Sequence, residues 1–309
     1  MAQQSGVTLL PESSLEARSL PGKVWYVLRR WPVLPLIVLV LLVITGLFAP
    51  QIAPQDPYKQ HLALRNAPPF WYTEYWAEQD DFKSSDRLLG GDHVGRDVLS
   101  RIIYGARISL QVLAVSLTTG VIIGTSLGLV AGYVGGLTDE LIMRMVDVWL
   151  SLPFVLIALV AVIVLGASLW LVMALLAMFT WPSFVRFVRG EVLSLKERDY
   201  VSLAKVAGAS TARVVLRHIL PGVLNTVIVI TTLRVGQLIL TEATLSFIGA
   251  GIPAPTPAWG LIVSEGRSYV TTAWWSTFFP GLAIFLVVMS LNFLGDWMRD
   301  RFDPRLRQL

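Results

Sequence analysis

Two ionisable residues stand inside an otherwise apolar run and are the clearest candidates for chemistry in this sequence. Arg234 and Glu242 lie within residues 222–248, a stretch long enough to cross a bilayer. A charged side chain at membrane depth costs about 3 kcal/mol, so such residues mark functional positions by default. Eight helical residues separate the two by about 12 Å, too far for a direct ion pair. Each therefore faces a wet pathway or a polar partner on another chain, unless it forms a buried hydrogen bond with another span.

Motifs for covalent or cofactor chemistry are absent from the sequence. No G-x-x-x-x-G-K-[ST] phosphate loop and no H-E-x-x-H zinc motif occurs. His93 stands beside Asp92 and near Asp97, which suits a metal ion, but such a loop histidine is more often an ordinary hydrogen-bonding residue. The chain has no cysteine, which excludes disulfides and thiolate chemistry. We expect no catalytic residue, no metal and no cofactor in this chain.

The composition is that of a membrane protein. Of the 309 residues, 54% are hydrophobic and 15% are charged, and the mean hydropathy is +0.64. A soluble domain has about a quarter of its residues charged. The net charge of +4 comes from Lys and Arg beside the apolar runs, as membrane topology requires, so it does not indicate nucleic-acid binding.

Six apolar runs predict an all-α polytopic membrane protein with six transmembrane helices, at residues 33–48, 108–133, 141–165, 169–188, 222–248 and 278–294. Lys and Arg outnumber the acids in 1–31 and 186–218, whereas charges nearly balance in 51–105. The positive-inside rule then places both termini and the 186–218 loop in the cytoplasm. Segments 51–105 and 249–277 are expected outside. We expect residues 97–109 to lie along the outer surface before the second span.

Four glycines in the second predicted span fall four residues apart, at Gly120, Gly124, Gly128 and Gly132. On a helix this spacing puts them in one groove, where the backbone of another helix can approach closely. Mere tolerance of glycine in a membrane helix is the alternative. The exact register favours a packing seam, and we expect no ligand site there.

A short polar helix is predicted between the fourth and fifth spans. Asp199 is placed to cap its start, and Gly208 to end it in the left-handed conformation. Its apolar residues fall at i, i+3, i+4 and i+7, at Tyr200, Leu203, Ala204 and Ala207. In an aqueous loop this stripe needs a partner. A helix lying on the bilayer surface is the alternative.

The same segment resembles a known signature. Permease subunits of binding-protein-dependent ABC importers share the cytoplasmic pattern E-A-A-x3-G-x9-I-x-L-P, to which residues 202–221 are similar. The matching positions are Ala204, Gly208, Leu220 and Pro221. The departures, at the acid, the first alanine and the isoleucine, are Ser202, Leu203 and His218.

Further stretches resemble the dipeptide, oligopeptide and nickel subfamily of these permeases. They are LGGDHVGRDVLSR at 89–101 with YGARISL at 104–110, and LTEATLSFIG at 240–249, continued by Pro-Ala-Trp-Gly at 257–260 and Asp-Pro-Arg at 303–305. The resemblance covers nearly the whole chain from about residue 30. It points to the C-type member of a two-permease pair, which has a short outer domain.

This resemblance implies a type I ABC importer permease fold over residues 32–309, following a cytoplasmic tail at 1–31. The expected partners are a homologous second permease, two cytoplasmic ATPase subunits, an extracytoplasmic solute-binding protein and the lipid bilayer of a prokaryotic inner membrane. ATP and Mg would belong to the ATPase. The residues implied in ATPase coupling are Asp199, Tyr200, Leu203, Ala204, Ala207, Gly208, Leu220 and Pro221.

The implied function is import of di- or oligopeptides, with Arg234 and Glu242 as candidates for the translocation pathway. Nickel chelates or glycosides are alternative cargo within the family. A self-sufficient secondary transporter would show inverted repeats and broken midplane helices, and only these two residues support it. A passive assembly scaffold does not explain polar residues buried in the fifth span.

Overall fold

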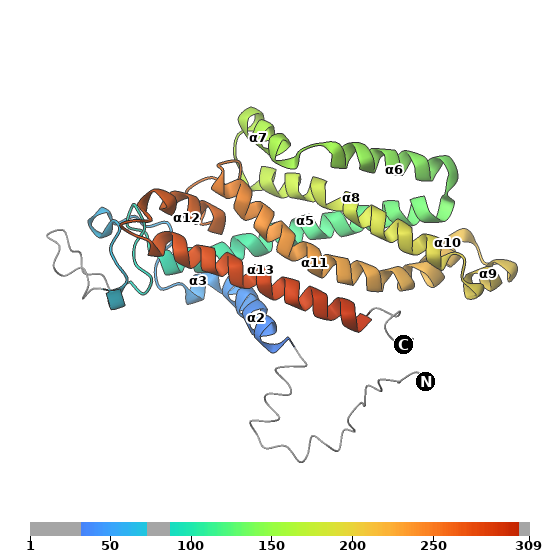
Figure 1. The fold of residues 1–309 in the computed structure, drawn as a ribbon, viewed down its shortest axis with the longest axis horizontal. Helices are drawn as coiled ribbons and strands as arrows, with labels where there is room; N and C mark the ends of the chain where they lie inside the picture. The colour runs from blue at the N-terminus through green and yellow to red at the C-terminus, as the bar shows by residue number, and fades with distance from the viewer. Residues whose placement is uncertain (1–31, 73–86, 303–309) are drawn as a thin grey trace, which may run out of the picture.

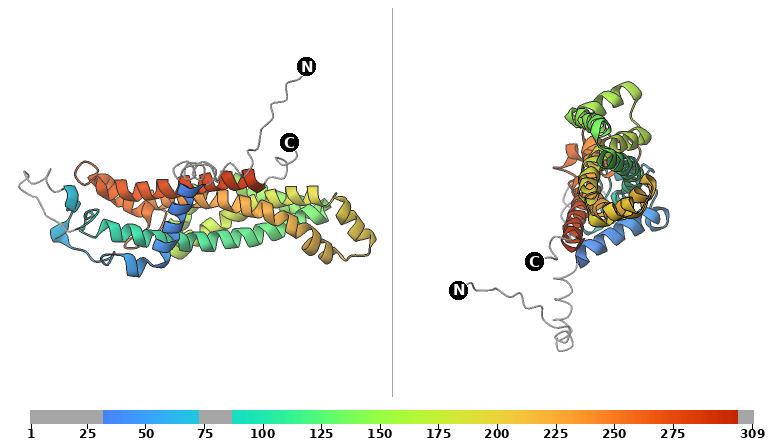
Figure 2. Two further views of the ribbon diagram at one scale, coloured as in Figure 1. Left: turned by 90° about the horizontal axis from the view of Figure 1, so that it is seen from below. Right: turned by 90° about the vertical axis from the view of Figure 1, so that its right-hand side faces the viewer.

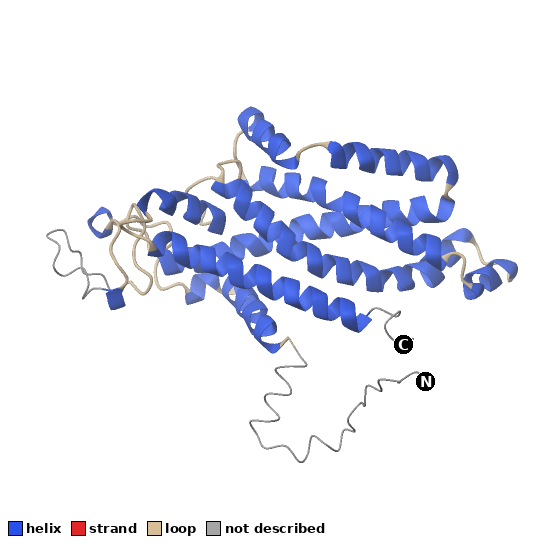
Figure 3. Cartoon of the chain, in the orientation of Figure 1, coloured by secondary structure: helices blue, strands red, loops and turns tan. Residues whose placement is uncertain are grey.

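The computed structural model describes residues 32–72 and 87–302. These residues form a bundle of helices (Figures 1 and 3), whose β structure amounts to one isolated bridge between Gly91 and Asp97. The predicted cytoplasmic tail, the last seven residues and part of the 51–105 segment lie outside the described residues.

The described part of the chain contains twelve α- and π-helical segments in the following order. They are α2 (Val33–Leu47), α3 (Ala49–Ile52), α5 (Val98–Val134), α6 (Gly136–Ser151), α7 (Phe154–Leu165), α8 (Leu169–Leu195), α9 (Asp199–Val206), α10 (Thr211–Val214), the π-helical η4 (Val215–Ile219), α11 (Leu220–Phe247), α12 (Trp259–Gly266) and α13 (Trp275–Phe302). Short 3-10 turns occur at Leu62–Leu64, Phe70–Tyr72 and Arg267–Tyr269.

The predicted multi-pass membrane fold is confirmed, while the six predicted spans take unequal forms and not all have the length of a straight transmembrane helix. Four helical stretches have the length and hydropathy to cross a bilayer: α5, α8, α10 to α11, and α13. Helix α2 is apolar but has only 15 residues. Figure 2 shows it inclined steeply across the bundle against α5 and α13.

The third predicted span is not one straight helix. It divides into α6 and α7, which are bent by 76° relative to each other. Pro153 precedes α7, and Leu152 adopts the extended conformation that a following proline imposes (φ −83°, ψ 129°). The continuous apolar run across 141–165 gave no sign of this break. The proline at position 153 was the sequence feature that could have indicated it.

The second predicted span begins earlier than expected, and residues 98–109 continue it instead of forming a separate surface segment. The Asp97 carboxylate accepts hydrogen bonds from the Ser100 backbone N–H (2.8 Å) and hydroxyl (2.6 Å). This cap starts a 37-residue helix at Val98. The polar residues of its first turns are buried against loops and α12, so their polarity does not place them on an open surface.

The glycine seam is confirmed, and its partner is α8. A Cβ atom on Gly120, Gly124, Gly128 or Gly132 would collide with α8 side chains that repeat at the same interval, at Thr180, Phe184, Val188 and Val192. Helices α5 and α8 therefore lie with their backbones in close contact and form the centre of the bundle. The remaining long helices pack around this pair, with α9 at one end of the bundle and α12 at the other (Figure 1).

Candidate functional site

Helix α9 projects from one end of the bundle and is anchored by a single buried side chain. Val201 is fully buried among the valines of α8 and the first residues of α11. Asp199 is the first helical residue and not the predicted cap, because Arg198 holds the extended cap conformation without a side-chain hydrogen bond. Because Asp199 lies in the first turn, its carboxylate still interacts favourably with the positive end of the helix dipole.

The opposite face of α9 is apolar and uncovered. Tyr200, Leu203 and Val206 have exposed fractions of 44%, 68% and 87%. Ala207 is exposed as well, whereas Ala204 is half-buried, so the exposed stripe includes Val206, which the sequence interpretation omitted. Large apolar side chains with this exposure on an eight-residue helix indicate a surface that another molecule covers.

Gly208 ends α9 in the left-handed conformation, as predicted, with φ +78°. Its N–H donates to the carbonyl of Lys205, and the N–H of Ala209 donates to that of Ala204, both at 3.0 Å. These two bonds make a Schellman motif, which fixes the direction in which the chain leaves the helix. The helix and its exit are therefore rigidly defined.

Two routes connect α9 to the membrane helices. Behind Val201, the buried residues Val214 and Ile219 pack in the same cluster as Val188 of α8. On the other side, the Lys205 ammonium lies 5.7 Å from the ring centre of Tyr133, near the end of α5. Displacement of α9 would therefore act on α5, α8 and α11 together.

Leu220 and Pro221 open α11 directly after the π-helical turn η4. The helix is continuous across this junction, where the Leu220 N–H donates to the carbonyl of Val215, so Pro221 removes one N–H donor from the helical hydrogen-bond ladder. The π turn widens the backbone between α10 and α11, and such turns are frequent at functional positions. The predicted signature residues thus occupy α9, its exit and the start of α11.

The structure separates Arg234 and Glu242, although both lie on α11. Glu242 is 2% exposed and accepts a hydrogen bond from the Ser246 hydroxyl at 2.8 Å. That hydroxyl in turn accepts the backbone N–H of Ile252 at 3.2 Å. Arg234 is half-buried on another face, where its guanidinium donates to the side-chain carbonyl of Gln237.

At the end of the bundle opposite α9, a buried ionic network joins three elements. Arg101 of α5 donates to Asp92 and to Glu265 of α12, both at 2.7 Å. Arg96 contacts the same two carboxylates at 2.6 and 2.8 Å. The sequence interpretation missed Glu265, whose signal was its place as the lone acid in 249–277.

The charge of Asp92 is maintained by this network. Burial raises the pKa of the Asp92 carboxyl, but the guanidiniums of Arg101 and Arg96 and the Arg96 backbone N–H outweigh that effect and lower it. Asp92, His93 and Glu265 lie close enough to hold a metal ion. Both carboxylates already contact two guanidiniums. This group of side chains is therefore better suited to ion pairing than to binding a metal cation.

Comparison with known proteins decides the family. Residues 124–308, more than half of the chain, match the family model described as binding-protein-dependent transport system inner membrane component. The chain belongs to this family. The permease also matches, at residues 24–69, the model of the N-terminal TM domain of oligopeptide transport permease C.

Curated relatives of the permease match along most of their length. The dipeptide transport system permease protein DppC of Haemophilus influenzae is 37% identical over 98% of both chains. The di/tripeptide transport system permease protein DppC of Pseudomonas aeruginosa is 39% identical over 88% of this chain and 87% of its own. The glutathione transport system permease protein GsiD of Pectobacterium atrosepticum is 43% identical over 72% of this chain and 74% of its own.

A solved structure shares the fold. A chain from inward-facing conformations of the MetNI methionine ABC transporter aligns with a TM-score of 0.52 and 19% identity, covering 65% of the permease and 96% of that chain. At this identity the likeness concerns the fold alone. The family match and the curated relatives identify the protein as the permease subunit of an ABC importer, which works in a complex with other subunits.

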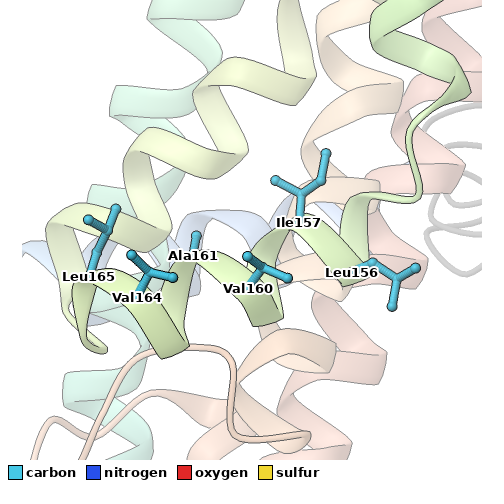
Figure 4. A pocket seen from close by; sticks show the side chains of 6 residues that line it. All are labelled: Leu156, Ile157, Val160, Ala161, Val164 and Leu165. Atoms are coloured by element: carbon cyan, nitrogen blue, oxygen red, sulfur yellow. The ribbon is translucent and has the colours of Figure 1, made fainter.

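One hollow in the permease is formed by α7 alone. Its volume is about 420 Å³, and Figure 4 shows the side chains that line it: Leu156, Ile157, Val160, Ala161, Val164 and Leu165. The lining side chains are all apolar and offer no group to orient a polar solute. The hollow suits contact with lipid tails or with another apolar helix better than a transport site.

Proposed function

We propose that this chain is one of two permease subunits of an ATP-driven importer for short peptides, coupled through α9 to a separate ATPase. The observation that carries the coupling is the uncovered stripe of Tyr200, Leu203 and Val206 on a helix anchored only by Val201. Neighbouring exposed apolar side chains of this size are typical of a surface that binds a partner.

The proposed assembly contains a homologous second permease, two cytoplasmic ATPase subunits and an extracytoplasmic solute-binding protein, in the cytoplasmic (inner) membrane of a prokaryote. ATP and Mg are bound by the ATPases, since this chain has no phosphate loop. Family membership supports a multi-subunit importer. The buried network of Asp92, Arg101 and Glu265 gives the outer loops the rigidity that a docking surface for the binding protein needs.

The names of the relatives favour peptide cargo. They are described as transport proteins for dipeptides, di- and tripeptides, and glutathione. All of these are short amide-linked molecules with at least one free carboxylate. This common chemistry supports short peptides over the nickel chelates or glycosides that the sequence left open.

In the proposed cycle, closure of the ATPases moves α9, and the movement passes into the membrane helices as a rigid-body switch. The Val201 cluster carries it to α8 and α11, and the contact between Lys205 and Tyr133 carries it to α5. Of the two predicted pathway residues, we place Arg234 beside the pathway. Glu242, enclosed within the chain, supports the turn after α11 through Ser246.

The test uses the complete complex reconstituted in vesicles, with binding protein outside and ATP available to the ATPases. Leu203→Asp should abolish the ATP hydrolysis that peptide-loaded binding protein stimulates, and should weaken co-purification of the ATPase. The matched control is Leu137→Asp, because Leu137 is also an exposed leucine (78%) but lies on α6 and not on the α9 stripe. Normal coupling in Leu203→Asp, or transport by this chain alone down an ion gradient, would overturn the proposal.

A further inference from the structure

A polar stripe runs along the exposed side of α11 and has Arg234 at one end. Gln237, Thr241 and Thr244 follow at helical spacings of three, four and three residues. Gln237 and Thr244 are exposed, while Arg234 and Thr241 are half-buried. Arg234 stands at the middle of the 28-residue helix. Here an arginine is most costly and most in need of a polar counterpart.

Among the described side chains of residues 32–72 and 87–299, no carboxylate forms an ion pair with Arg234. Its hydrogen-bond partner is the side-chain carbonyl of Gln237, one turn further along the helix. Glu242 is not the counter-ion of Arg234, because its carboxylate is buried and accepts a hydrogen bond from the Ser246 hydroxyl. A neutral amide thus holds the guanidinium in place, and no carboxylate in the described part of the chain compensates its positive charge.

We propose that Arg234 is a transient binding site for the carboxylate of the peptide during its passage, with Gln237 as a positioning residue. The inference rests on the proposed function. A guanidinium presents a planar set of donors that matches a carboxylate in two parallel hydrogen bonds. In surroundings of low dielectric constant these charge-assisted bonds are stronger than they would be in water.

The neutral partner explains how cargo would leave again. An acidic partner would have neutralised Arg234, and a second cation beside it would have bound an anion too tightly for transit. Conduction through a membrane requires binding that is favourable enough for entry and weak enough for release. One arginine oriented by one amide meets both conditions.

The rest of the stripe matches the other end of a short peptide. The Thr241 and Thr244 hydroxyls donate to the backbone carbonyls of Gln237 and Leu240, both at 2.7 Å, so their oxygens keep lone pairs that can accept an ammonium N–H. Ten helical residues from Arg234 to Thr244 span about 15 Å. An extended di- or tripeptide spans about 7–11 Å and fits within that length.

An acidic side chain of the second permease is the competing counterpart for Arg234. That arrangement would be structural, and it would make no distinction between cargo with and without a carboxylate. The chemistry of the cargo therefore separates the two cases.

The experiment compares Arg234→Gln with the unaltered protein in the reconstituted complex. Uptake per ATP hydrolysed is measured for a dipeptide and for the same dipeptide with an amidated C-terminus, each at a concentration shown by direct titration to saturate the binding protein. Arg144→Gln is the charge-matched control, since Arg144 is an exposed arginine on α6. Thr232→Val is the control within α11, because Thr232 lies outside the stripe and bonds only to the carbonyl of Val229.

We expect Arg234→Gln to lower uptake of the free-acid peptide about tenfold while uptake of the amide changes less than about twofold. Gln237→Leu should show the same selectivity in weaker form, and both controls should resemble the unaltered protein. Equal losses for acid and amide, or loss of subunit assembly, would establish the structural role and overturn the proposal. Normal uptake of both would also overturn it, whereas absence of ATP-driven uptake in the unaltered complex would contradict the proposed function itself.

Discussion

Gly124 of α5 lies directly against Phe184 of α8. A Cβ atom at Gly124 would stand 2.4 Å from the Cβ of Phe184 and 2.6 Å from the carbonyl oxygen of Trp181. Real Cβ atoms do not approach other heavy atoms so closely, so the two helices meet backbone to backbone. This contact sets the spacing at the centre of the bundle, on which the positions of α9 and α11 depend.

Replacement of Gly124 by alanine should therefore destabilise the permease by about 1–3 kcal/mol through overpacking. The measurement is the thermal unfolding of the detergent-purified complex. Gly190 on α8 is the matched control, because nothing lies within 4 Å of a Cβ at that position. Gly190→Ala should leave stability unchanged or raise it by up to about 1 kcal/mol through helix propensity. If both variants unfolded alike, the seam would not be a close-packed contact.

Substitution Asp92→Asn should loosen the end of the bundle opposite α9. It leaves the fully buried Arg101 with one carboxylate fewer, and removal of one partner from a buried ion pair costs about 3–5 kcal/mol. Asp147→Asn is the control, because the pair between Asp147 and Arg186 is about half exposed and such pairs contribute at most about 1 kcal/mol. Thermal unfolding of the two variants in parallel gives the comparison, and a larger loss in Asp147→Asn would contradict the assignment.

The same carboxylate predicts a pH dependence. The pKa of Asp92 is lower in the folded protein than in the unfolded chain, because Arg101, Arg96 and a backbone N–H outweigh the effect of burial. Its contribution to stability is therefore complete above the unfolded pKa of about 4 and is lost as the pH falls through the lower folded value. The difference in melting temperature between the unaltered protein and Asp92→Asn should be large at pH 7 and should shrink below pH 4. A constant difference would show that Asp92 acts through packing instead of charge.

Gly208 offers a test of the backbone geometry after α9. Its φ of +78° strains any β-branched residue, yet nothing lies within 4 Å of a Cβ there, so conformation alone is tested. Gly208→Val should cost about 1–2 kcal/mol locally and reduce ATPase coupling, with membrane insertion intact. Gly208→Asn should be tolerated better, because asparagine adopts this conformation more readily. Equal coupling in the two variants would contradict a requirement for the left-handed exit.

Glu242 should behave as a structural residue and Arg234 should not. Glu242→Ala removes the acceptor for the buried Ser246 hydroxyl, which should lower stability by about 1–3 kcal/mol. Glu242→Gln retains a carbonyl acceptor and should be milder. The yield of folded complex in size-exclusion chromatography, followed by thermal unfolding, measures both. Full stability of Glu242→Ala would return this residue to the list of pathway candidates.

Several features followed from the sequence because their causes are local or repetitive. Apolar runs of bilayer length predicted the multi-pass helical fold, and the four-residue spacing of Gly120 to Gly132 predicted a seam on one helix face. Gly208 was expected in the left-handed conformation because its position ended an amphipathic pattern. Each of these is a property of one segment and needs no knowledge of its neighbours.

Only the tertiary structure decided which segments meet and which faces they bury. Arg234 and Glu242 look alike in the sequence, but packing encloses Glu242 around Ser246 and leaves Arg234 on an exposed stripe. Arg101 forms ion pairs with both Asp92 and Glu265, although Glu265 lies more than 160 residues further along the chain. The glycine seam packs against α8. Periodicity gives the direction of a side chain relative to its own helix axis. The neighbour in that direction depends on how the helices are arranged in space, which no single segment encodes.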